Sequence, residues 1–141
     1  MKERPARVAR PARLRRPRRP RRPPEDGADL AAAVAACGER KAVDGLVLDL
    51  RGLTDVTDEF LIVSGTSDTH VRAIAEHVLE TLRLRDVRAH HVEGLAAGRW
   101  VLLDFVDFVV HVFHPVLREF YQLERLWGDA PRRPLEAGEE T

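Results

Sequence analysis

The stretch from Gly98 to Arg132 constrains the fold more than any other part of this sequence. Two apolar segments, with a tight reversal at Phe105 and Val106 between them, predict a pair of strands. Pro115 then suits the first turn of a helix, and Gly128 suits its end. The block therefore predicts a hairpin followed by an amphipathic helix, which fixes one fold element and one surface.

A two-residue loop at Phe105 and Val106 predicts the register of this hairpin. Four cross-strand pairs follow from it: Val101 with Val110, Leu103 with Phe108, Trp100 with His111, and Leu102 with Val109. The first two pairs share one face of the hairpin, and the last two share the other. Both faces are apolar, so we expect helices over one face and either more helix or a partner over the other.

The helix after the hairpin carries apolar side chains at the spacing of one buried stripe. The stripe contains Val116, Phe120, Leu123 and Trp127. We expect it to pack against the sheet and to complete the core.

Earlier in the chain, residues 29–43 and the segment after Ser67 predict helices, while residues 45–50, 60–64 and 87–92 predict strands. The helix after Ser67 has the clearest buried face: Val71, Ile74, Ala75, Val78 and Leu82. The predicted order is α-β-β-α-β-β-β-α, a mixed α/β fold in one compact domain over residues 25–132.

The formal charge of zero hides an uneven distribution. Residues 1–24 contain 11 of the 23 Lys and Arg residues, one acid and six of the nine prolines, which predicts a disordered arm. This arm is interpreted as an electrostatic tether to RNA phosphates, as an organellar transit peptide, or as an inessential extension. The remaining 12 basic residues face 22 acids, and residues 133–141 predict a flexible acidic tail.

Cys37 is the only cysteine, which excludes an intramolecular disulfide and fits a reducing cytosol. On an Ala-rich helix it is expected to be a small buried residue. No apolar run approaches the ~20 residues that a membrane-spanning helix requires. We therefore expect a cytoplasmic protein without a membrane partner.

Two patterns outside the histidines could carry chemistry. Ser64-Gly-Thr-Ser67 joins a strand to a helix, where phosphate could bind, but it lacks the Lys and second Gly of a P-loop, and a simple helix cap is the alternative. Asp104 and Asp107 would face each other across the hairpin end, as solvated carboxylates, acceptors for a basic partner, a cation site or an acid/base pair. No nucleophile is evident near the two carboxylates.

The six histidines could suggest a zinc site. His90 and His91 are adjacent, so strand alternation sends them to opposite faces. His70 and His77 share a polar helix face and are expected at the surface. We therefore expect no metal, no cofactor and no catalytic residue.

Several motifs together resemble the ribosomal silencing factor family, also called the Iojap-like family. The resemblance covers residues 29–132 and rests on one set: Thr57, Asp58, Gly65, Thr66, Ser67, Arg72, Trp100, Asp104, Asp107, His111, Tyr121 and the Leu123–Trp127 segment. It implies a nucleotidyltransferase-like topology without known catalytic activity. It also implies binding to the large ribosomal subunit through ribosomal protein number fourteen, which blocks joining of the small subunit and represses translation.

The resemblance and the hairpin together predict a partner-binding surface. Its residues are Trp100, Leu102, Asp104, Asp107, Val109 and His111. A large-subunit assembly factor and, less favoured, a nucleotide-binding enzyme are the alternative functions, and a homodimer of the free protein would also cover the apolar face. The family commonly has Gly in the hairpin turn, where this chain has Val106, so a longer turn or another turn type is the alternative to the predicted register.

Overall fold

The computed structural model describes residues 27–135. Its elements are α2 (Gly27–Glu39), β1 (Val43–Asp49), β2 (Glu59–Ser64), α3 (Asp68–Leu84), β3 (His91–Glu93), β4 (Trp100–Asp104), β5 (Phe108–Phe113), α4 (Pro115–Tyr121), α5 (Leu123–Leu126) and β6 (Arg132–Pro134). The predicted mixed α/β fold in a single domain is confirmed. The predicted order holds as far as the last helix, which is divided in two and is followed by an additional strand.

The six strands form one sheet in the order β3-β4-β5-β2-β1-β6. Strands β2 and β5 pair in parallel, and the other four pairs are antiparallel. Strands β5 and β2 therefore lie in the middle of the sheet, while β4 has only the three-residue strand β3 between it and the edge.

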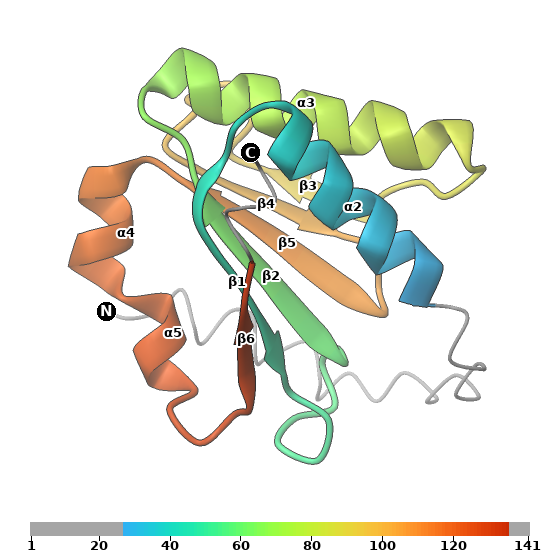
Figure 1. Cartoon of the computed structure of the whole chain (residues 1–141), viewed down its shortest axis with the longest axis vertical. Helices are drawn as coiled ribbons and strands as arrows, with labels where there is room; N and C mark the ends of the chain where they lie inside the picture. The colour runs from blue at the N-terminus through green and yellow to red at the C-terminus, as the bar shows by residue number, and fades with distance from the viewer. Residues whose placement is uncertain (1–26, 136–141) are drawn as a thin grey trace.

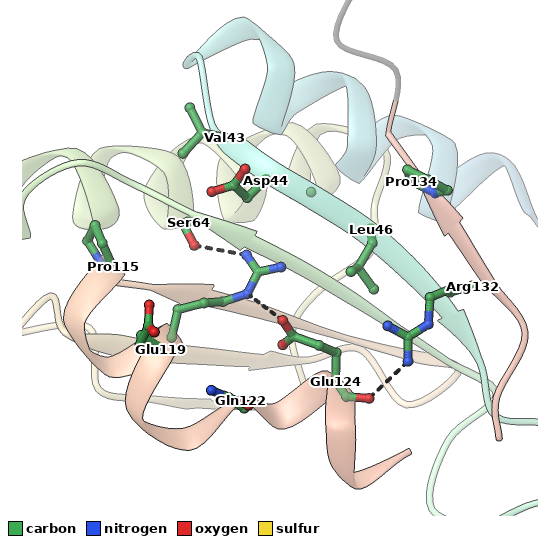
Figure 2. Close-up of a pocket in the computed structure, with 12 residues that line it drawn as sticks. Val43, Asp44, Leu46, Ser64, Pro115, Glu119, Gln122, Glu124, Arg132 and Pro134 are labelled. Carbon is green, nitrogen blue, oxygen red and sulfur yellow. Dashed lines mark hydrogen bonds and ion pairs between the residues drawn. The ribbon is translucent and has the colours of Figure 1, made fainter. Parts of the chain in front are cut away.

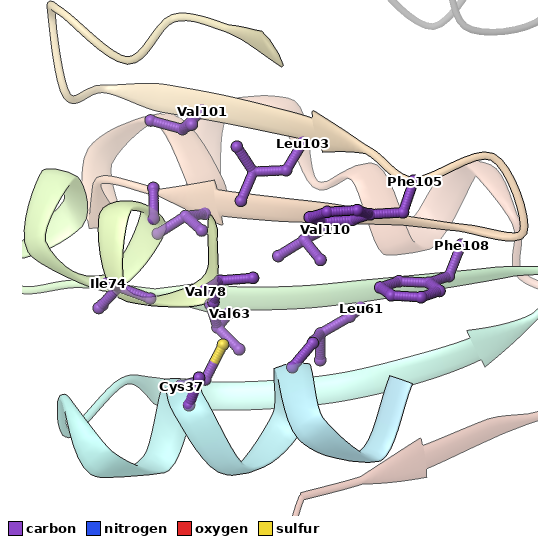
Figure 3. Packing of buried hydrophobic residues seen from close by; sticks show 14 of the residues in the cluster. Cys37, Leu61, Val63, Ile74, Val78, Val101, Leu103, Phe105, Phe108 and Val110 are labelled. Carbon is purple, nitrogen blue, oxygen red and sulfur yellow. The ribbon is translucent and has the colours of Figure 1, made fainter. Parts of the chain in front are cut away.

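Helices α2 and α3 cover one face of the sheet (Figure 1). Ser67 caps α3 by accepting a hydrogen bond from the backbone N–H of His70 at 3.1 Å. The predicted face of α3 is fully buried: Val71, Ile74, Ala75, Val78 and Leu82. These side chains meet Leu61, Val63, Val101, Leu103 and Val110 of the sheet, and Cys37 of α2 lies among them (Figure 3). Cys37 is buried as predicted, and burial raises the pKa of its thiol to about 12.

Helices α4 and α5 cover the opposite face, but the predicted stripe is wrong in its first half. Val116 and Phe120 are 60% and 73% exposed, whereas Leu123 is buried and Trp127 is half-buried. The reason is Gln122, which has a left-handed backbone (φ 46°) and separates the two short helices. The break changes the direction of the chain, so residues on either side of it no longer share one helical face.

The predicted register of the β4–β5 hairpin is also wrong, by two residues. Trp100 pairs with Phe113, Leu102 with His111, and Asp104 with Val109. A shift of two preserves the faces, because side chains alternate with period two. The reversal is centred on Val106, whose φ is 75°, and the N–H of Asp107 donates to the carbonyl of Phe105 at 2.9 Å. The turn is thus of another type, and Asp104 does not face Asp107 across the strands.

The chain beyond residue 132 was predicted to be flexible, but its first part is a strand. Strand β6 pairs with β1, with Arg133 opposite Val47 and Pro134 opposite Leu46. Among residues 27–135, no helix is long and apolar enough to cross a membrane. The predicted arm, residues 1–24, and the end of the predicted tail, residues 136–141, lie outside the described residues.

Candidate partner-binding surface

The six predicted surface residues all lie on the β4–β5 hairpin. Trp100, Leu102 and Asp104 are on β4, Val109 and His111 are on β5, and Asp107 lies in the turn between the strands. Trp100 and Leu102 of β4 lie on the same face of the sheet as Val109 and His111 of β5, as predicted. Helices α4 and α5 cover this face. The structure therefore brings the predicted set together, although in a different register.

Burial divides this set into a supporting row and an accessible row. Val109 and His111 are 4% and 0% exposed, because β5 lies in the middle of the sheet beneath the C-terminal helices. Trp100, Leu102, Asp104 and Asp107 are half-buried. Only these four can contact a partner of the folded domain, and the two β5 residues support them from below.

Trp100 is held on three sides. Its ring stacks on Phe113, with the centroids 4.8 Å apart, and meets Tyr121 of α4 at 5.0 Å. Its indole Nε1–H donates a hydrogen bond to Nδ1 of His111 at 3.1 Å. The ring is consequently fixed, while part of its surface remains accessible.

His111 is the one histidine of the described chain that is fully buried. Burial lowers its pKa to about 3, so the imidazole is neutral at physiological pH. Its Nε2 is buried without a hydrogen-bond partner. The ring meets Phe60 edge to face, with the centroids 4.5 Å apart.

The acidic end of the hairpin is braced by side-chain contacts. Asp104 Oδ1 accepts a hydrogen bond from the N–H of Val106 at 2.8 Å, and the hydroxyl of Thr57 donates to the Val106 carbonyl at 2.9 Å. A positive φ is costly for a β-branched residue, and these two contacts hold Val106 in that conformation. Thr57 is buried, so it supports the turn. Sequence reasoning did not assign this role, although a Thr within an acidic turn segment was the available signal.

An exposed aromatic surface adjoins Trp100 and was missed in the sequence. Tyr121 contacts Trp100 on one side, and its ring meets Phe120 at 4.9 Å on the other. Phe120 is 73% exposed and Tyr121 is 36% exposed. We call Trp100, Tyr121 and Phe120 the aromatic row. Phe120 was missed because the unbroken helical spacing assigned it to the core.

Several polar groups of the Ser64–Ser67 turn are engaged within the domain. The N–H of Gly65 donates to Phe113, and the N–H of Thr66 donates to Nδ1 of His70 at 2.8 Å. Ser64 Oγ accepts from Arg118 at 2.9 Å. The turn serves as a helix cap and as a junction to α4, and His70, predicted as solvated, joins it to the carbonyl of Arg40 at 2.6 Å.

A cleft of about 550 Å³ lies between α4 and strands β1, β2 and β6 (Figure 2). Arg118 spans it, donating to Ser64 and pairing with Glu124 at 3.4 Å, and Arg132 donates to the Glu124 carbonyl at 3.1 Å. These contacts tie the C-terminal helices to the sheet. In residues 27–135, no group of three or more His, Cys, Asp or Glu side chains could hold a metal ion.

The profile of a family described as "Ribosomal silencing factor during starvation" matches residues 23–141. The chain belongs to this family. It is 45% identical over 109 residues to the ribosomal silencing factor RsfS of Bacillus subtilis, covering 77% of this chain and 92% of that protein. It is also 32% identical to the mouse protein named mitochondrial assembly of ribosomal large subunit protein 1, covering 70% of this chain and 45% of that protein.

Solved structures of similar sequence have the same fold. A crystal structure of a Chromobacterium violaceum protein has a TM-score of 0.70 at 35% identity, covering 72% of this chain and 84% of that one. One from Bacillus halodurans has a TM-score of 0.67 at 38% identity, covering 75% and 96%.

In this silencing factor, Arg72, which is part of the family resemblance, and Gly98 support the surface from a distance. Arg72 of α3 donates to the carbonyl of Ala96 at 3.2 Å and so holds the loop that leads into β4. Gly98 ends that loop with φ 69°, and a Cβ there would lie 2.7 Å from the carbonyl oxygen of Asp68. Any side chain at this position would displace the start of β4, where Trp100 lies.

Proposed function

We propose that this silencing factor represses translation by binding the large ribosomal subunit at its intersubunit face, through ribosomal protein number fourteen. A domain bound there blocks association with the small subunit. The names of the relatives support a ribosomal role, since the Bacillus protein is a ribosomal silencing factor and the mouse protein is named for the large subunit. The proposed site of action is the cytoplasm.

The observation that carries this proposal is the aromatic row, which lies at the end of the hairpin opposite its acidic turn. Trp100, Tyr121 and Phe120 form one continuous set of ring contacts, and each ring is partly accessible. Tyrosine and tryptophan frequently dominate binding energy at interface centres, and a single such anchor contributes about 2 kcal/mol or more. The row therefore has the composition of a docking centre.

Charge supports a basic partner. Asp104 and Asp107 lie at the end of the hairpin, and residues 25–141 contain 22 acids and 12 basic residues. These negative charges repel the phosphate backbone of RNA, whereas they attract a basic protein surface. A ribosomal protein fits this surface better than ribosomal RNA does. Repression by steric exclusion needs tight binding and no chemical step.

The proposal is tested by replacing the central anchor. Trp100→Ala should weaken binding to isolated large subunits by about 30-fold, the loss of about 2 kcal/mol, as measured by co-sedimentation at increasing protein concentrations. Leu53→Ala removes another exposed apolar side chain, 44% exposed and outside the hairpin, and is the matched control. Wild-type affinity of a Trp100→Ala protein that melts cooperatively would show that the docking surface lies elsewhere.

The second candidate function is assembly of the large subunit, which the name of the mouse relative favours. The same surface would then be occupied before translation begins. Cells without the protein should accumulate incomplete large subunits if it acts in assembly. If it acts as a repressor, they should retain more joined ribosomes during starvation, and sucrose-gradient profiles separate the two results.

A further inference from the structure

We infer that His111 is a positioning residue, which holds Trp100 for docking by accepting its indole N–H and so leaves only the ring for the partner. This inference rests on the proposed function, since it concerns the same surface. It adds a role for a residue that no partner can reach and specifies the chemistry of the contact at Trp100.

The hydrogen bond fixes the chemical state of both rings. An indole N–H can only donate, so Nδ1 of His111 is the acceptor and the imidazole proton is on Nε2. The imidazole is fully buried and neutral, which keeps Nδ1 available as an acceptor. A protonated imidazole would have no acceptor, and the contact with Trp100 would be lost.

His111 is a costly residue for a structural role alone. It is the one polar residue of β5, where all six positions are buried, and its Nε2–H has no hydrogen-bond partner. A buried donor without a partner destabilises a fold, and an apolar side chain of similar size would avoid that cost. Stability therefore does not explain the histidine, whereas the contact with Trp100 does.

The same hydrogen bond limits what the partner can offer at this position. Trp100 has one polar hydrogen, and it points toward His111 inside the domain. The accessible part of the ring can receive aliphatic side chains or a cation above its face, but it cannot donate to a carbonyl or a phosphate. An Arg or Lys side chain satisfies this requirement, and a basic surface that carries it also suits the acids at the other end of the hairpin.

Two substitutions separate positioning from stability. His111→Leu removes the acceptor at similar volume, and His111→Gln removes the ring but keeps an acceptor. We expect His111→Leu to melt no lower than the wild type but to bind large subunits on the order of tenfold more weakly. His111→Gln should recover most of that affinity, even if it melts lower.

The state of the indole gives a second readout. The Trp100 N–H signal in a proton–nitrogen NMR spectrum is identified by its loss in Trp100→Phe. It should shift and exchange faster with solvent in His111→Leu and remain near its wild-type position in His111→Gln. Val63→Ala, a buried change on the other face of the sheet, is the control: it should lower the melting temperature without moving the signal or the affinity.

The outcomes distinguish this inference from the proposed function. If Trp100→Ala binds normally, the docking surface is wrong. If Trp100→Ala fails to bind while His111→Leu binds like the wild type, the surface is right and the positioning role is wrong. Equal losses of affinity in His111→Leu and Val63→Ala would also overturn the positioning role, because general destabilisation would then explain both.

Discussion

The two faces of the sheet are covered in different ways. Helices α2 and α3 cover one face and enclose a layer of buried aliphatic and aromatic side chains. Helices α4 and α5 cover the other face only partly, leave Phe120 exposed and enclose the polar ring of His111. The first face is built for stability, whereas the second combines a smaller core with an accessible surface. This contrast predicts that substitutions on the first face change stability and that those on the second change binding.

The largest expected effect on stability comes from a substitution on the first face, beneath α2 and α3. Ile74→Ala removes a fully buried side chain between α3 and the sheet and should lower the free energy of unfolding by about 2–5 kcal/mol. Urea denaturation followed by circular dichroism measures the change. Val116→Ala, at a 60% exposed position of α4, is the control and should stay within about 0.5 kcal/mol. Similar losses from the two substitutions would contradict the division between the faces.

The free energy of unfolding should depend on pH through His111, which lies on the second face. Burial lowers the pKa of His111 to about 3 from an ordinary value of 6.5, so below pH 6.5 the unfolded chain binds a proton that the folded chain excludes. Stability should therefore fall as the pH drops from 6.5 toward 3, by at most about 1.4 kcal/mol per pH unit.

The contribution of His111 is the difference between the wild type and His111→Leu. Denaturation at several pH values should give curves that run parallel above pH 6.5 and change their separation below it, because only the wild type then loses the contribution of His111. Parallel curves over the whole range would mean that His111 is not buried in its neutral form.

A smaller effect is expected at the start of α3. Ser67→Ala removes the side chain that accepts from the backbone of His70 and should cost about 1 kcal/mol. Ser67→Asp keeps an acceptor and should restore most of the stability. Thermal denaturation compares the three proteins, and affinity for the large subunit should remain unchanged in all of them. A loss of affinity in Ser67→Ala would place this turn in the docking surface.

The first face was predictable from the sequence, because its signals are local and periodic. Val71, Ile74 and Val78 repeat at helical spacing after a capping serine, and the structure buries all three. The alternation of β4 and β5 likewise assigned Trp100 and His111 to one face, and the two-residue error in register left the faces unchanged.

The second face was harder to predict because a single residue breaks its periodicity. Gln122 has no sequence signal as clear as Gly or Pro, yet its left-handed backbone moves Phe120 from the predicted core to the surface. Val106 also adopts a positive φ that its type disfavours, and one of the two contacts that hold it comes from Thr57, 49 residues away. Both features depend on tertiary structure, which short-range patterns do not contain.

The aromatic row gives the smallest expected effect on stability and so tests the contrast most directly. Phe120→Ser changes a side chain that is 73% exposed, and the free energy of unfolding should stay within about 0.5 kcal/mol of the wild type. Because Phe120 contacts Trp100 only through Tyr121, its loss should weaken large-subunit binding by about three- to tenfold, less than Trp100→Ala does. Leu84→Ser, at a 71% exposed position of α3, is the matched control and should bind normally. If the two serine variants bind equally well, the docking surface ends at Tyr121 and Phe120 takes no part in it.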